Sequence, residues 1–149
     1  MPGTPDKVLS RDFTIDVSAL GTPSWVPIGG LDEDGISQAV SSRTIDYMDA
    51  DDNGVAKPVR IGLGYTYSLK GARMESVVDG TRDPGQAAVE ATQDITGLAG
   101  MLMYQITSPA AATPEVLTFS ATAEVNAMAG GDKCGWTATL QCFGSPVRS

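Results

Sequence analysis

The sequence feature that most constrains the fold is an unbroken alternation of apolar and small or polar residues from Val59 to Leu69. Successive side chains of a β-strand point to opposite faces, so this alternation predicts one strand with a polar face and with an apolar face that packs on the core along its whole length. At about 3.3 Å per residue the strand would extend about 36 Å, which is long for a globular protein. The apolar residues are Val59, Ile61, Leu63, Tyr65, Tyr67 and Leu69, and the others are Arg60, Gly62, Gly64, Thr66 and Ser68.

Shorter alternating runs predict further strands. One run starts at Phe13, and two others, at 117–125 and 134–142, flank the pair Gly130-Gly131 and predict a hairpin. We therefore expect a mainly β fold in a single domain, 1–149. Within this domain, residues 1–11 would form an extended amino-terminal arm and residues 46–58 a projecting acidic loop.

One α-helix is expected over 83–97. Asp83 can cap its first turn, Pro84 suits the first helical position, and Gln86 occupies the capping-box position. Gly97 would end the helix in a left-handed conformation. Its alanine-rich sequence predicts close packing against a sheet or a neighbouring subunit.

The composition favours a globular protein without catalytic machinery. The 149 residues are 42% hydrophobic and 19% charged, which suffices for a core. There is no histidine, so the usual general base near neutral pH and the commonest metal ligand are missing. The formal net charge of −8 would repel the phosphates of nucleic acid. We expect no enzymatic activity, no cofactor and no metal.

The sequence also indicates where the chain functions. No stretch approaches the roughly 18 apolar residues of a membrane span, and the amino terminus lacks the features of a signal peptide. A cytosolic origin without membrane contact is the expectation. Cys134 and Cys142 would lie about 26 Å apart on one strand, well beyond the reach of about 7 Å for a disulfide. Both are expected to be buried free thiols.

The acidic loop contains a partial calcium motif. Asp49, Asp51 and Asn53 match the first oxygen ligands of an EF-hand loop, and Gly54 matches its glycine turn. The ninth position is Lys57 and the twelfth is Arg60, where calcium needs oxygen ligands. The alternative is a solvated acidic loop, because Asp and Asn favour turns.

The order of these parts resembles the major tail protein, or tail tube protein, of long-tailed bacteriophages, particularly those of actinobacterial hosts. The similarity runs from about residue 12 to residue 147. It rests on the order of the strands, on the acidic excursion before the long strand, and on three segments: Trp25–Leu31, the helix start Asp83–Gln86, and Trp136–Pro146. The architecture is also similar to the tube protein of type VI secretion.

This resemblance implies two packed antiparallel sheets, as in a β-sandwich or barrel-forming fold, flanked by one helix. It also implies a homo-hexameric ring, with stacked rings forming the conduit through which DNA passes into the host without specific binding. Tape-measure, tail tip and tail terminator proteins would be partners. The location would be the tail of the virion, assembled in the host cytoplasm.

Two sets of site residues follow from the resemblance. The loop falls where the family contacts a neighbouring ring or subunit. The polar strand face would line the lumen or meet another subunit. An alternative class is a β-sandwich binding module for head decoration or adhesion, stabilised by calcium. The loop set is Asp46, Asp49, Asp51, Asp52 and Asn53, and the strand set is Arg60, Gly62, Gly64, Thr66, Ser68 and Lys70.

Overall fold

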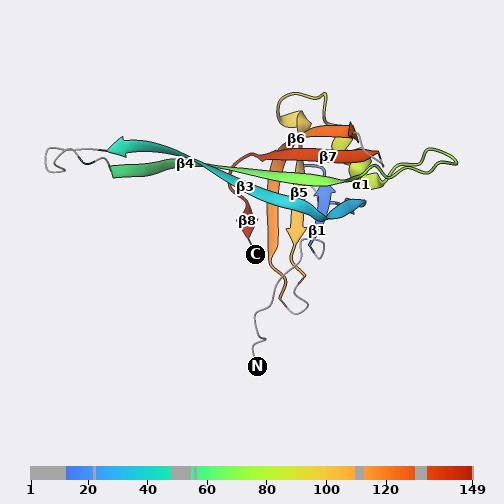
Figure 1. The fold of residues 1–149 in the computed structure, drawn as a ribbon, viewed down its shortest axis with the longest axis horizontal. Helices are drawn as coiled ribbons and strands as arrows, with labels where there is room; N and C mark the ends of the chain where they lie inside the picture. The colour runs from blue at the N-terminus through green and yellow to red at the C-terminus, as the bar shows by residue number, and fades with distance from the viewer. Residues whose placement is uncertain are drawn as a thin grey trace.

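The computed structural model describes residues 13–21, 23–47, 55, 57–109, 113–129 and 134–148. Eight strands and one α-helix make up most of this part of the chain (Figure 1). The predicted amino-terminal arm, 1–11, lies outside the described residues. The elements are β1 (Thr14–Ser18), β2 (Val26–Pro27), β3 (Leu31–Tyr47), β4 (Lys57–Ala72), α1 (Pro84–Glu90), β5 (Met101–Thr107), β6 (Val116–Ala129), β7 (Gly135–Cys142) and β8 (Val147–Arg148).

The strands form one continuous antiparallel sheet in the order β2-β1-β5-β6-β7-β4-β3, and β8 pairs with β6. The expectation of a mainly β fold with one α-helix is confirmed. The expected division into two sheets is not found, because hydrogen-bonded pairing runs through all eight strands without a break. The sheet does not close into a barrel, since β2 and β3 remain at its two ends.

Strand β6 joins the two halves of the sheet. Its first half pairs with β5 from Val116 to Thr122, and its second half pairs with β7 from Ala121 to Ala129. The strands β1 and β5 run crosswise to β4 and β7 (Figure 1). Strand β6 therefore belongs to both halves of the sheet, which differ in orientation. This arrangement lets a single sheet enclose a core.

The core lies between these halves. Tyr67 of β4 stacks on Phe119 of β6 with ring centroids 4.5 Å apart, although β4 and β6 are not neighbours in the sheet. Phe119 in turn stacks on Tyr104 at 5.6 Å. The buried hydrophobic residues are Ile15, Val17, Ile28, Tyr67, Leu69, Val89, Met101, Tyr104, Ile106, Phe119, Ala121, Trp136, Ala138 and Leu140.

The helix α1 begins as expected and ends early. Asp83 caps it, because its Oδ2 accepts a hydrogen bond from the backbone N–H of Gln86 at 3.0 Å. The predicted range 83–97 is wrong at its end, since α1 stops at Glu90. From Thr92 onward the backbone N–H groups donate to carbonyls three residues earlier instead of four. The Thr92 hydroxyl also donates to the Val89 carbonyl at 3.0 Å and competes there with backbone N–H groups. Gly97 has a positive φ of 75°, but it precedes a 3₁₀ turn instead of ending α1.

Gln86 connects the helix to the sheet. Its Nε2 donates to the carbonyls of Gly29 and Ala72 at 2.9 Å each, and its Oε1 accepts from the N–H of Met74 at 3.1 Å. The side chain is fully buried. It thus satisfies three backbone groups around the ends of β3 and β4, a role that a capping-box position alone does not predict.

The cysteines are both free, as expected, but Cys134 is exposed and Cys142 is only half-buried. The expectation that both thiols are buried is therefore wrong for Cys134, which lies just before β7. Within the described ranges, no helix has the length and apolar character needed to cross a membrane.

Candidate assembly surface on the β3–β4 arm

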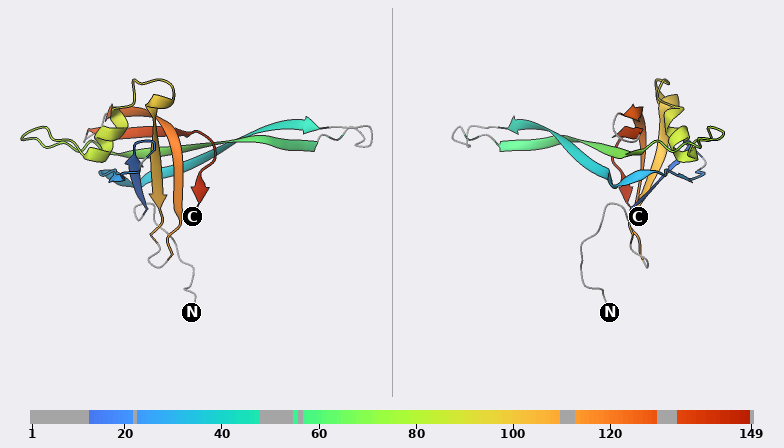
Figure 2. Two further views of the ribbon diagram at one scale, coloured as in Figure 1. Left: turned by 180° about the vertical axis from the view of Figure 1, so that it is seen from behind. Right: turned by 45° about the vertical axis from the view of Figure 1, so that its right-hand side comes forward.

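The most prominent feature of the molecule is a two-stranded projection. Strands β3 and β4 pair from Leu31–Gly71 to Tyr47–Lys57, whereas β7 pairs with β4 only between Thr66 and Ala72. Residues 40–47 and 57–65 therefore continue beyond the rest of the sheet, and we call these residues the arm. The arm stands clear of the body in every view (Figures 1 and 2).

The base of the arm is anchored in the core. Tyr67 and Leu69 are 2% and 1% exposed, and the Tyr67 hydroxyl accepts a hydrogen bond from Gln38 Nε2 at 2.7 Å. Gly71 is buried, and a β-carbon at this position would collide with the Gly30 carbonyl. The arm is thus a rigid continuation of strands whose other ends are packed tightly.

The apolar side chains of the arm itself are not covered. The apolar residues from Val59 to Leu69 were expected to face the core along the whole strand, and this is wrong for their first half. Strand β7 pairs with β4 only from Thr66 to Ala72, so no other strand of the described part of the chain pairs with the arm. Five large apolar side chains are each about half exposed: Val40 at 53%, Ile45 at 50%, Val59 at 47%, Ile61 at 51% and Leu63 at 46%.

A register shift places apolar residues on both faces of the arm. Arg43 lies opposite Gly62, but Thr44 lies opposite Arg60, so Ile61 is the extra residue of a β-bulge. Opposite residues of an antiparallel pair share a face, and a shift by one residue exchanges the faces. The pair Ile45–Val59 therefore lies on the face of Arg43, whereas Leu63 lies on the other face. The expected grouping of Arg60 with Gly62 and Gly64 on one polar face is interrupted at this bulge.

The predicted polar residues divide between the arm and the body. Arg60, Gly62 and Gly64 belong to the arm, where the glycines and Ser41 line a shallow hollow. The remaining three, Thr66, Ser68 and Lys70, lie in the part of β4 that pairs with both β3 and β7. The lumenal or inter-subunit role of these six residues stays a prediction.

The register extends the polar surface of the body across the sheet. Ser68 lies opposite Thr139, which lies opposite Glu124, and Lys70 lies opposite Thr137. These residues face away from the core, because the alternate positions Tyr67 and Leu69 are buried. We call this surface the hydroxyl face. Its members are Thr66, Ser68, Lys70, Thr122, Glu124, Asn126, Thr137, Thr139 and Gln141.

The acidic loop is shorter than expected. Strand β3 continues to Tyr47 and β4 starts at Lys57, so Asp46 is an exposed strand residue opposite Pro58. Asp49, Asp51, Asp52 and Asn53 lie outside the described residues. Both the contact role of this loop and its calcium alternative therefore stay predictions.

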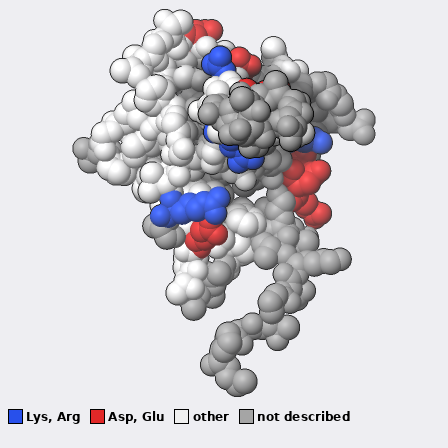
Figure 3. Space-filling model, turned by 90° about the vertical axis from the view of Figure 1, so that its left-hand side faces the viewer, with Lys and Arg blue, Asp and Glu red and all other residues white. Residues whose placement is uncertain are grey.

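Charges on the arm are mainly positive. Arg43 and Arg60 are exposed, and neither forms an ion pair with another described residue. Viewed along the arm, the molecule shows basic side chains beside the arm, and acidic side chains at one side, near the top and below, on a largely uncharged surface (Figure 3). The arm thus differs in sign from the chain, whose net charge is −8.

A second surface feature is a groove of about 320 Å³ on the body. It opens between the two halves of the sheet and is mainly apolar. None of its described lining residues carries a charged side chain. Its lining residues are Phe13, Ile36, Ser37, Gln38, Tyr67, Ile106 and Leu117.

Comparisons with known proteins locate this fold among tail structures. No family model and no curated protein matches the sequence. Similar folds occur in the tail of an empty gene transfer agent particle refined with C6 symmetry, at a TM-score of 0.63 and 14% identity, covering 93% of this chain and 96% of that chain. A chain of the native gene transfer agent virion matches at a TM-score of 0.59 and 13% identity, over 93% and 96%.

A third similar structure is the six-fold symmetrised baseplate of the anti-feeding prophage, at a TM-score of 0.60 and 11% identity, covering 99% of this chain and 97% of that chain. The chain therefore has a fold found in phage-tail-like assemblies. The resemblance to tail tube proteins that the sequence suggested is confirmed at the level of the fold.

Proposed function

We propose that this protein is a structural subunit of the tail tube of a phage-like particle, in which hexameric rings stack into a conduit for DNA. The observation that carries the proposal is the arm. A two-stranded ribbon is marginally stable in water unless its apolar side chains are covered. Here both faces of the arm carry large apolar side chains that are about half exposed. In the proposed assembly, other copies of the chain bury these side chains.

The position of the arm favours a cyclic or helical assembly. The arm projects from one end of the molecule, and in the proposed assembly it covers a different surface of a second copy. Such heterologous contacts generate closed rings or open filaments, and a tube combines ring closure with stacking. The six-fold symmetry in the descriptions of two similar structures supports a ring of six.

The edges of the sheet support the same assembly. Strand β3 has 17 residues and forms one end of the sheet, and from Ser37 to Tyr47 no described strand pairs with its outer edge. A long free edge is a template for pairing with another chain. Pairing between neighbours would join six open sheets into one closed wall, which removes the edge.

The hydroxyl face is our candidate for the lumen wall. Its Thr and Ser residues are small and uncharged, and Lys70 and Glu124 carry opposite charges. A surface with little net charge would let DNA pass without holding it, and the overall charge of −8 would oppose binding. In this proposal the protein acts structurally, without catalysis. The tape-measure, tail tip and tail terminator proteins would be its partners, and Asp46 with the acidic loop would contact a neighbouring ring.

Negative-stain microscopy of concentrated protein tests the proposal, alone and with tail tip and tape-measure proteins. Rings or tubes with six-fold symmetry are the expected result. The variant Val59→Ser/Leu63→Ser should remain folded and lose assembly. Leu98→Ser is the matched control, since Leu98 is 67% exposed but lies outside the arm. Monomers under all conditions would contradict the proposal.

A further inference from the structure

The loop between β4 and α1 is a second projection with no assigned role. We call residues 74–82 the tip loop. Its two sides are joined by a bridge between Glu75 and Arg82, and the Ser76 N–H donates to the Thr81 carbonyl at 2.8 Å. Asp79 Oδ1 accepts hydrogen bonds from the Thr81 N–H at 3.1 Å and from its hydroxyl at 2.8 Å. The tip loop is therefore a hydrogen-bonded hairpin with a defined shape.

Two apolar side chains lie at the end of this loop. Val77 is 102% exposed and Val78 is 92% exposed, the highest values among the exposed large hydrophobic residues that the structure describes. Polar residues flank the two valines, with Ser76 before them and Asp79-Gly80 after them. Two valine side chains exposed to water do not stabilise the loop itself. Since the hairpin already fixes their position, little conformational entropy would be lost when a partner covers them.

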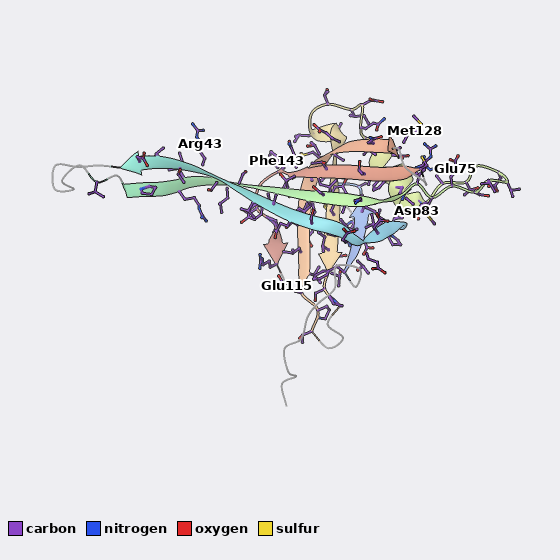
Figure 4. The ribbon with its side chains drawn as sticks, viewed as in Figure 1. Arg43, Glu75, Asp83, Glu115, Met128 and Phe143 are labelled. Carbon is purple, nitrogen blue, oxygen red and sulfur yellow. The ribbon has the colours of Figure 1, made fainter. Side chains whose placement is uncertain are left out.

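The tip loop and the arm lie at opposite ends of the molecule. Arg43 marks the arm and Glu75 marks the tip loop, far apart along the long axis (Figure 4). The two surfaces therefore cannot meet within one chain. Two copies placed head to tail bring the tip loop of one copy to the arm of the next, and repetition of this contact gives a ring or a filament.

The two surfaces are complementary in character. Both present apolar side chains to water. The arm adds Arg43 and Arg60, which form no ion pair with a described residue, whereas the tip loop adds Asp79. Opposite charges beside an apolar contact favour this pairing and its register. The groove on the body is less suitable, because its neighbour Arg148 is already paired with Glu115 at 3.3 Å.

We propose that Val77 and Val78 of one copy pack against the Leu63 face of the arm of the next copy, with Asp79 beside Arg60. The occupant of the arm is thus a second copy of this chain, and the contact adds to the edge pairing between neighbours in the ring. This inference rests on the proposed tail-tube function, which places the edge of β3 between neighbouring subunits but does not say which surface covers the arm.

Cysteine cross-linking tests the pairing. In a Cys134→Ser/Cys142→Ala background, Val78→Cys and Leu63→Cys are combined in one chain, assembled and mildly oxidised. A non-reducing gel should show a ladder of covalent multimers that reaches six, whereas each single variant gives at most a dimer. Val78→Cys with Leu98→Cys is the matched control and should give no ladder. Val78→Cys with Leu117→Cys probes the groove, and a ladder there would overturn the proposal.

Microscopy of the same samples separates the two possible failures. Rings that form without a 78–63 cross-link would overturn the pairing and leave the tail-tube function intact. If the unmodified protein forms no rings, both the pairing and the tail-tube function are contradicted. As a second measurement, Val77→Ser/Val78→Ser should raise the protein concentration needed for assembly at least tenfold, and Leu98→Ser should leave it unchanged. Equal effects of these two changes would count against the proposal.

Discussion

The indole N–H of Trp136 donates a hydrogen bond of 2.9 Å to Glu90 Oε1, the same oxygen that binds Arg82 Nη2 at 2.7 Å. Trp136 is fully buried in β7, Glu90 is the last residue of α1, and Arg82 lies at the base of the tip loop. One carboxylate oxygen therefore links the sheet, the helix and the loop that carries Val77 and Val78.

This link predicts a loss of stability in acid. Burial acts to raise the pKa of Glu90, but the hydrogen bonds from Arg82 and Trp136 outweigh it and hold the pKa below the ordinary value of 4.5. The stabilisation is complete above the pKa of the unfolded chain and is lost as the pH falls through the lower pKa of the folded state. Glu90→Gln should lower the free energy of unfolding at pH 7 by about 1–3 kcal/mol.

Urea unfolding at several pH values checks this prediction. The difference between the original protein and Glu90→Gln should shrink as the pH falls below about 4.5, the ordinary pKa of a glutamate. Glu124→Gln serves as the control, because Glu124 is exposed on β6. A difference independent of pH would show that the charge of Glu90 is not responsible.

The buried amide of Gln86 predicts a second stability effect. Gln86→Leu leaves the carbonyls of Gly29 and Ala72 and the N–H of Met74 without their partner. Unsatisfied buried groups of this kind cost about 1–3 kcal/mol each, so for three groups we expect a total loss of about 3 kcal/mol or more in urea unfolding. Gln93→Leu, at an exposed position after the helix, should change stability by less than about 0.5 kcal/mol.

Two leucines of β4 distinguish the arm from the core. Leu69→Ala should lower the free energy of unfolding by about 2–5 kcal/mol, because Leu69 is 1% exposed. Leu63→Ala should cost less than about 1 kcal/mol in the unassembled chain, since its side chain is 46% exposed. Equal losses would mean that the arm is covered in the single chain. Amide exchange should likewise be faster at Leu63 than at Leu69 until rings form.

Alanine substitutions at two glycines distinguish the cost of backbone strain from the cost of a steric collision. Gly30 and Gly144 both have positive φ, at 76° and 86°. A β-carbon at Gly144 meets nothing within 4 Å, whereas one at Gly30 lies 2.5 Å from Met74 Cγ and 2.8 Å from the Ala72 carbonyl oxygen. Gly144→Ala should cost about 1–2 kcal/mol, and Gly30→Ala about 1–3 kcal/mol more in thermal unfolding. A smaller loss at Gly30 would show that Met74 moves aside freely.

Local sequence patterns predicted the strands and the start of the helix more accurately than they predicted the tertiary contacts of these elements. Alternation identified β4, and the sequence Asp83-Pro84 identified the start of α1, because both depend on neighbouring residues. The end of α1 depends on the Thr92 hydroxyl, and that competition has no clear signature in the sequence. The continuity of the sheet depends on β6 serving two partners, which alternation within β6 cannot show.

The candidate surface could be predicted only in part. The sequence indicated Gly62, Gly64 and their neighbours on β4, but the exposure of Val59 depends on where β7 ends, which is set by tertiary pairing. The bulge at Ile61 is equally invisible in a regular alternation. Val77-Val78 within a polar turn was a signal that could have identified the tip loop.

The arm is covalently continuous with β4, which lies between β3 and β7 and carries Tyr67 and Leu69 into the core. Its ladder hydrogen bonds run perpendicular to the strand. A pull on the arm from a neighbouring subunit therefore loads the bonds between Thr66–Gln141 and Ala72–Gly135 in shear, all at once, instead of opening them one after another. Mechanical tension applied at the arm is thus borne by a strand that is hydrogen-bonded on both sides and carries two core residues.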